Sequence, residues 1–144
     1  MQTFLPYPDF KLSASVIDRQ RLGKQRIETW QIVQALTVPE YGWKNHPAVK
    51  MWQGHVPSLI EYGIAICEEW RSRGYKDTML QRFLGIRDVN NASAPYWIGN
   101  VEFHAAHRSK LLRKNFEWYS KYGWAEPNDL EYIWPAPKGN WLIT

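Results

Sequence analysis

Residues 58–73 read SLIEYGIAICEEWRSR, and this stretch decides the predicted fold. Its apolar residues recur every three or four positions on two adjacent stripes, which is the period of an α-helix. Ser58, which follows Pro57, and Glu61 make a capping-box pattern at its start, and Gly74 stands where a left-handed cap belongs. So wide an apolar arc predicts that this helix lies at the centre of the core.

Three further helical patterns run over Ser13–Leu36, Asn100–Tyr122 and, more briefly, Thr78–Leu84. Ser13 and Asn100 suit helix N-caps, whereas Pro39 and Gly123 suit the residues that follow a helix. The expected buried stripes are Leu22, Thr29, Val33 and Leu36, widened by Ile27 and Trp30, and then Val101, Ala105, Leu112, Phe116 and Tyr119. No alternating strand pattern stands out, and an irregular tail rich in aromatic residues and proline begins at Trp124. We therefore predict an all-α fold, a compact single domain over residues 1–144 with three long helices and one short one.

Composition narrows the classes of protein that this chain can belong to. Its 144 residues suit one domain, and its single cysteine, Cys67, excludes an intrachain disulfide framework and a multi-cysteine zinc site. No apolar run approaches the roughly 20 residues of a membrane span, and the N-terminus lacks a signal-peptide pattern. We therefore expect a cytoplasmic protein, associated with the nucleoid, that has no membrane partner.

Positive charge is concentrated in two segments, although the net charge is only +4. Residues 19–26 (RQRLGKQR) hold four cations and no acid, and residues 104–114 (HAAHRSKLLRK) hold four more with two histidines. Residues 42–52 add aromatic side chains interleaved with Lys, Asn and His. These patterns favour a nucleic-acid footprint, in which bases stack and phosphates pair. The alternative is two solvated helix faces and a loop that Trp43 and Trp52 anchor to the core.

One acid stands among the cations of the first basic segment. At about 100° per residue, Arg21, Lys24, Gln25 and Glu28 share a narrow helical stripe. This pattern fits a carboxylate with phosphate-binding cations on either side, but an exposed Lys24–Glu28 pair is the simpler alternative. His104 and His107 are spaced for a metal, with His46 and His55 as further ligands, yet phosphate contact or a place at the core edge fits them better.

Three segments in this order resemble the pyrimidine-dimer DNA glycosylase family, of the phage endonuclease V type. They are Arg21–Glu28 (RLGKQRIE), Cys67–Thr78 (CEEWRSRGYKDT) and Trp118–Gly123 (WYSKYG). The resemblance implies a glycosylase and abasic-site lyase that works without metal or cofactor. It also implies that the N-terminal amine attacks C1′ of the damaged nucleotide, expels the base and leaves an imine that permits strand cleavage.

In the resemblance, Glu28 matches the catalytic glutamate, and the amine belongs to Met1 or, after removal of Met1, to Gln2. The bulk of Gln2 disfavours that removal, and an exposed Gln2 can cyclise. Either His107 or Arg108 matches a cation of the family's third helix. The full set of expected DNA contacts is Arg21, Lys24, Gln25, Arg26, Lys44, Asn45, His46, Lys50, His104, His107, Arg108, Lys110, Lys114, Trp118 and Lys121. The expected partner is double-stranded DNA, kinked and with an extruded base, bound by a monomer that needs no protein partner.

Two other functions remain open from the sequence. The scaffold could bind kinked or modified DNA without catalysis, or it could excise a different modified base. A histidine–metal hydrolase is a weaker third alternative.

Overall fold

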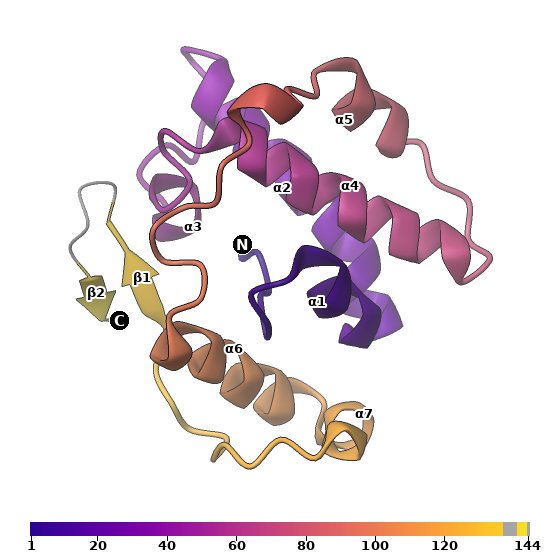
Figure 1. Cartoon of the computed structure of the whole chain (residues 1–144), viewed down its shortest axis with the longest axis vertical. Coiled ribbons are helices and arrows are strands. Elements are labelled where there is room, and N and C mark those ends of the chain that lie inside the picture. Colours follow the sequence, from indigo (N-terminus) through magenta and orange to yellow (C-terminus); the bar gives the residue numbers. More distant parts are fainter. Residues whose placement is uncertain (137–140, 144) are drawn as a thin grey trace.

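Helix α4 (Val56–Ser72) lies at the centre of the fold, as the apolar arc predicts, and contacts α1, α2 and α5. A computed structural model describes residues 1–136 and 141–143 (Figure 1). The other helices are α1 (Phe10–Val16), α2 (Arg19–Thr37), α3 (Pro47–Lys50), α5 (Leu80–Gly85), α6 (Val101–Lys114) and α7 (Phe116–Tyr119), with short 3-10 turns at Val89–Asn91 and Ser120–Tyr122. The predominantly helical fold is confirmed. No described helix is both long and apolar enough to cross a membrane.

The first long helix was predicted as one element, but it is two. The first piece ends at Val16, where Ile17 turns to an extended backbone. Asp18 then caps α2, because its carboxylate accepts from the Arg21 N–H at 3.4 Å while its own backbone is extended. Asp9, not Ser13, caps α1 and accepts from Leu12 N–H at 2.8 Å. Ile27, expected in the core, is 49% exposed, so α2 buries a narrower face than its sequence indicates.

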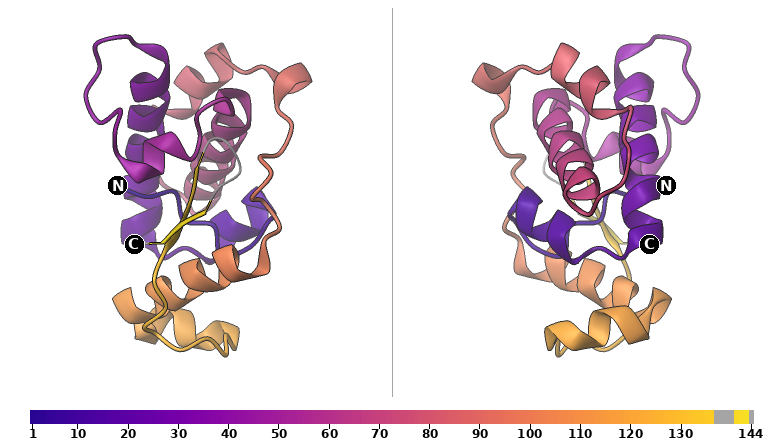
Figure 2. Two further views of the ribbon diagram at one scale, coloured as in Figure 1. Left: turned by 90° about the vertical axis from the view of Figure 1, so that its left-hand side faces the viewer. Right: turned by 90° about the vertical axis from the view of Figure 1, so that its right-hand side faces the viewer.

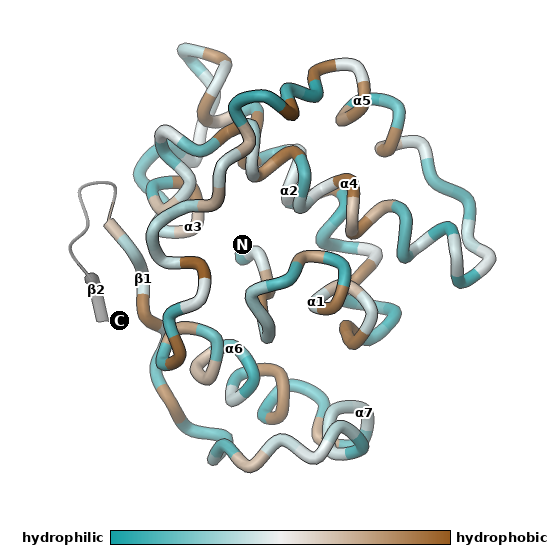
Figure 3. Tube along the Cα trace, viewed as in Figure 1, coloured by the Kyte–Doolittle hydropathy of each residue, from teal (hydrophilic) through white to brown (hydrophobic). Residues whose placement is uncertain are grey.

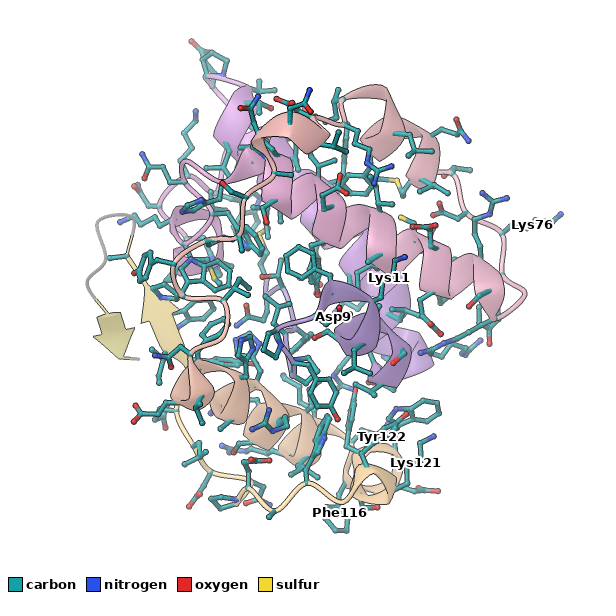
Figure 4. All side chains as sticks on the ribbon, in the orientation of Figure 1. Asp9, Lys11, Lys76, Phe116, Lys121 and Tyr122 are labelled. Carbon is teal, nitrogen blue, oxygen red and sulfur yellow. The ribbon has the colours of Figure 1, made fainter. Side chains whose placement is uncertain are left out.

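The third long helix is also divided, at Asn115. Asn100 caps α6 as predicted, but Asn115 takes a non-helical backbone and caps α7 by accepting from Trp118 N–H at 3.1 Å. The predicted apolar stripe is wrong in part: Val101 is 77% exposed, and Phe116 is 66% exposed and points away from the body of the molecule (Figure 4). The buried face instead carries Phe103, His104, Ala106, His107, Ser109, Leu111 and Leu112.

The ends of α4 show which of the predicted caps form. The helix begins at Val56, so Ser58 is an interior, buried residue, and the predicted capping box does not form. Glu61 instead pairs with Arg87 at 2.8 Å. Gly74 has the predicted left-handed backbone, with φ +94°. Gly63 lies where α5 approaches closely, since a Cβ there would stand 2.6 Å from the Phe83 ring.

The tail contains a small antiparallel hairpin that was not predicted. Strand β1 (Ile133–Pro135) pairs with β2 (Trp141–Ile143), and Trp134 stands opposite Leu142. Three-residue strands are too short to show an alternating pattern in sequence. Strand β1 contacts α3 and α6 and so covers one side of the fold (Figure 2).

The N-terminal segment, residues 1–6, runs into the middle of the molecule between α2 and α6 (Figures 1 and 2). Residues 2–6 are buried, although Gln2 and Thr3 are polar. Hydrophilic and hydrophobic residues are interspersed along the helices that surround this segment, as in helices that have one buried and one open side (Figure 3). An extended chain at this depth needs a partner for each of its backbone polar groups.

Candidate active site

The N-terminal amine and Glu28 meet at the surface end of the buried segment. The Met1 nitrogen lies 4.0 Å from Glu28 Oε2, and the Gln2 N–H donates to the same oxygen at 3.2 Å. Glu28 is 21% exposed, so its carboxylate reaches solvent but is held in place. The arrangement places the terminal amine, a group that can act as a nucleophile, close to a carboxylate, a group that can carry a proton.

Gln25 holds the first part of the segment. Its side-chain oxygen accepts from Phe4 N–H at 2.9 Å, and its amide nitrogen donates to the Gln2 carbonyl at 2.6 Å. The Tyr62 hydroxyl supports this contact: it lies 2.7 Å from the Gln25 side-chain oxygen and 2.8 Å from the Phe4 carbonyl, and these two acceptors share its one proton. Gln25 is only 1% exposed and its side chain is occupied by the N-terminal segment, so its contact with DNA stays a prediction.

Helix α6 holds the next part of the segment with two histidines. Leu5 N–H donates to His107 Nδ1 at 2.9 Å, and the Leu5 carbonyl lies 2.8 Å from His104 Nδ1. The two histidines are 0% and 2% exposed. Burial lowers the pKa of His107 to about 3, with His104 and Arg108 contributing in the same direction, and burial also lowers the pKa of His104. Both rings are enclosed and turned onto Leu5, so they present no surface to a phosphate in this structure. Their contact with DNA stays a prediction.

A hollow of about 260 Å³ opens beside the amine. Its lining includes Met1, Gln2, Phe4, Gln20, Arg21, Lys24, Gln25, Glu28, Lys114 and Tyr132. Three of these residues are cations, two from α2 and one from the end of α6. Within residues 1–136, neither Lys24 nor Lys114 forms an ion pair. Burial, followed by the charges of Arg21, Lys110 and Lys24, lowers the pKa of Lys114, so both desolvation and like charge disfavour its protonated form.

A second hollow, of about 400 Å³, shares Met1, Lys24 and Glu28 with the first. It is lined by Met1, Lys24, Ile27, Glu28, Gln31 and Trp43. Trp43 is 59% exposed and takes a left-handed backbone with φ +72°, which is uncommon for a residue with a large side chain. The two hollows therefore differ in character: the first is rich in cations and the second presents an exposed aromatic ring.

Comparison with known proteins gives the family. Residues 1–82 match the pyrimidine dimer DNA glycosylases, and this match covers more than half of the chain. The chain belongs to that family. The matched region holds the amine, Glu28, Arg21 and Lys24, whereas α6 and the hairpin lie beyond it. The chain matches no curated protein and no solved structure.

Arg26 and Arg108 were expected on DNA, but ion pairs within the protein engage both. Arg26 binds Asp77, whose side chain is fully buried, and its guanidinium lies 4.6 Å from the Trp70 ring centre. Although burial opposes it, the Arg26 hydrogen bond holds the pKa of Asp77 below its usual value. Arg108 binds Glu126 at 2.9 Å and also donates to the Pro6 carbonyl at 2.7 Å. Both arginines therefore tie elements of this glycosylase together.

The remaining predicted contacts lie outside the two hollows. Trp118 donates from its indole N–H to the Val16 carbonyl, and Lys121 Nζ lies 3.5 Å from its ring centre on the α7 side of the molecule (Figure 4). His46 caps α3 through Ala48 N–H at 3.0 Å, and burial together with the N-terminal ammonium lowers its pKa. Lys44, Asn45 and Lys50 are exposed nearby in sequence, and Lys110 packs over the Tyr132 ring at 5.4 Å.

Sequence reasoning missed three residues of this site. Tyr132 from the tail lines the first hollow, and burial raises its pKa to about 12. Gln20 lines the same hollow, and Tyr62 of α4 braces the buried segment. Tyr132 could have been predicted only from the knowledge that the tail packs against α6, and the sequence carries no signal for that contact. Trp52 is fully buried and packs edge-on against Trp97, so for this residue the alternative of a core anchor holds rather than a DNA contact.

Proposed function

We propose that this chain excises a damaged pyrimidine from DNA and then cleaves the strand through an imine on its N-terminal amine. The observation that carries the proposal is the 4.0 Å separation between the Met1 nitrogen and Glu28 Oε2, at the edge of a hollow lined with cations. Membership of the glycosylase family supports excision of a base from DNA. The imine and the strand cleavage are proposed from the position of the amine beside Glu28.

The chemistry requires an amine, a proton carrier and a path for the leaving group. The unprotonated amine attacks C1′ of the nucleotide, and the base leaves with the electrons of its glycosidic bond and takes up a proton. The sugar ring opens to a protonated imine. Loss of a proton from C2′ then expels the 3′ phosphate, and water releases the enzyme. Glu28 is placed to stabilise the cationic sugar and to carry these protons.

The two hollows suit the two parts of a distorted duplex. Arg21, Lys24 and Lys114 are the cations of the first hollow, and they would hold backbone phosphates beside the reacting sugar. Trp43 and Ile27 give the second hollow an apolar wall on which an extruded base can stack. We therefore propose a kinked duplex that bridges the hollows, across the Met1, Lys24 and Glu28 that line both.

The geometry serves either of the two possible N-termini. With Met1 present, its amine is the nucleophile. Without Met1, the Gln2 nitrogen becomes the terminal amine, and it already lies 3.2 Å from Glu28 Oε2. Cyclisation of an exposed Gln2 would remove the nucleophile. Intact-mass measurement of the purified protein identifies which terminus it carries.

Borohydride trapping tests this function. Reduction in the presence of a duplex that contains one abasic site should give a covalent protein–DNA adduct, and peptide mapping should place it on the first residue. Acetylation of the terminal amine should abolish the adduct, whereas a control acetylated only at lysines should retain it. Absence of an adduct, or an adduct on a lysine side chain, would refute the proposed nucleophile.

A panel of duplexes identifies the base. Cleavage of ultraviolet-irradiated DNA would support excision of a pyrimidine dimer. Cleavage of the abasic duplex alone would indicate a different modified base. Salt-sensitive binding of both duplexes with no cleavage would instead favour a non-catalytic DNA-binding protein.

A further inference from the structure

We infer that His104 and His107 are positioning residues that set how far the N-terminal amine reaches toward Glu28. This inference rests on the proposed function of that amine. It assigns to α6, which lies beyond the part of the chain that matches the glycosylase family, a role in aligning the nucleophile.

The two rings replace the neighbouring strand that an extended segment normally requires. Their spacing of three residues places them on one face of α6, a turn apart. One ring binds the N–H and the other binds the C=O of the same residue, Leu5, at 2.9 and 2.8 Å. This pair of contacts therefore fixes the position of Leu5 along the chain as well as its orientation.

The surrounding contacts determine which ring nitrogen of each histidine carries the proton. Gly99 N–H donates to His104 Nε2 at 2.9 Å, so the His104 proton lies on Nδ1 and points to the Leu5 carbonyl. His107 Nδ1 accepts from Leu5, so its proton lies on Nε2. That Nε2 is buried without a hydrogen-bond partner among the described residues. An unsatisfied buried donor carries a free-energy cost, which a residue that served packing alone would avoid.

The distance from Leu5 to the amine explains why this contact matters for chemistry. An extended chain advances about 3.3 Å per residue, so a slip of one residue at Leu5 would move the amine by about that much. A slip would also exchange the two faces of the segment and break the Gln25 contacts to Gln2 and Phe4. The side chain of Gln25 and the two histidines therefore fix one register together.

The experiment compares two substitutions of His107 in the full-length protein. His107→Asn retains an acceptor near the position of Nδ1, whereas His107→Leu removes it. His55→Leu is the matched control, because His55 makes no side-chain cap bond at the start of α4. Three quantities are measured for each protein: the single-turnover rate of borohydride trapping on an abasic duplex, the Kd for a duplex with an uncleavable abasic analogue, and the hydrogen exchange of the Leu5 amide.

For His107→Leu we expect trapping to slow roughly tenfold to a hundredfold, because a displacement of about 1 Å can cost that much. The Kd should stay within about twofold of wild type, and exchange at Leu5 should accelerate. His107→Asn should recover most of the trapping rate, and His55→Leu should leave all three quantities unchanged. If His107→Leu does not fold, His107→Asn alone tests the inference. Wild-type rates of trapping and of Leu5 exchange in His107→Asn would support it. Wild-type Leu5 exchange together with slow trapping in His107→Asn would overturn it.

Two results separate this inference from the proposed function. If the wild-type protein traps at its first residue and His107→Leu traps at the same rate, positioning by α6 is refuted and the function stands. If the wild-type protein gives no adduct, the proposed function fails. Accelerated Leu5 exchange in His107→Leu would then still support the hold of the two histidines on Leu5, and unchanged exchange would refute it.

Discussion

Helices α2 and α6 both carry a run of cations, and the sequence predicts the same role for both, but they face the N-terminal segment differently. Helix α2 contributes Arg21, Lys24 and Glu28 to the wall of the first hollow. Helix α6 turns its histidines inward onto Leu5 and leaves only Lys114, at its end, in that hollow. A basic segment can therefore be available to DNA only where its helix face is open. Where the helix face packs against other segments of the protein, as in α6, its basic side chains form hydrogen bonds inside the protein instead.

The largest expected effect is on the α2 side, at Glu28. Glu28→Gln removes the proton carrier but keeps the size of the side chain, so imine trapping should slow by roughly 10²- to 10⁴-fold. Glu40→Gln is the matched control, since Glu40 is exposed beyond the end of α2. Single-turnover trapping on an abasic duplex gives both rates. A loss of less than about threefold at Glu28 would remove that residue from the mechanism.

The outcome for the α2 site shows what sequence reasoning captures. The helical stripe of Arg21, Lys24 and Glu28 follows from local periodicity, and the structure does place the three residues around one hollow. The central position of α4 and the caps at Asn100 and Gly74 were predictable for the same reason, because each depends on neighbours in sequence.

The α6 site depends on contacts that sequence periodicity does not report. His107 meets a segment 102 residues away, and Tyr132 reaches the hollow through the hairpin. The breaks at Asp18 and Asn115 were missed because a single polar residue can end a helix by capping the next one, although the apolar spacing continues through it. Long-range burial, rather than local propensity, decides these features.

The next effect is on the pH dependence of the free energy of unfolding, and it tests the buried His107 on the inward face of α6. The pKa of His107 is lowered to about 3 by burial, whereas an unfolded histidine has its usual value near 6.5. Between these two values the unfolded chain binds a proton that the folded protein excludes, so the free energy of unfolding should fall as the pH falls from about 6.5 to 3. The loss that belongs to His107 is roughly 5 kcal/mol at most.

Urea unfolding at several pH values measures this effect. His107→Asn should be less stable than wild type at pH 7.5, but the difference should shrink or reverse toward pH 4, since the variant lacks the titrating group. Asp77 and Glu126 also lose stabilising contacts in acid, but they do so in both proteins, so their contribution cancels. Parallel stability curves across this pH range would show that His107 does not remain neutral in the folded protein.

A smaller effect, on the salt dependence of DNA binding, should distinguish Lys24 of α2, which forms no ion pair among the described residues, from Arg108 of α6, which pairs with Glu126. Lys24→Ala should weaken DNA binding by a few-fold and reduce the slope of log Kd against log salt by about 1. Arg108→Gln should leave that slope unchanged and lower the free energy of unfolding by about 1–3 kcal/mol, because the Pro6 carbonyl and Glu126 lose their partner. A reduced salt slope in Arg108→Gln would place this residue on DNA after all.

The smallest effect is expected at Lys121, which lies on the α7 side with Trp118 rather than at either hollow. Its ammonium lies over the Trp118 ring, and the Trp118 indole is fixed to the Val16 carbonyl at 2.7 Å. Lys121→Ala should therefore change trapping on an abasic duplex by less than about twofold and cost about 0.5–1 kcal/mol of stability. Lys114→Ala is the comparison, because it removes one cation from the first hollow and should reduce the salt slope. Equal losses of DNA affinity in the two variants would extend the DNA footprint from the hollows to α7, and the distinction between an open and a packed basic face would then fail at that end of the molecule.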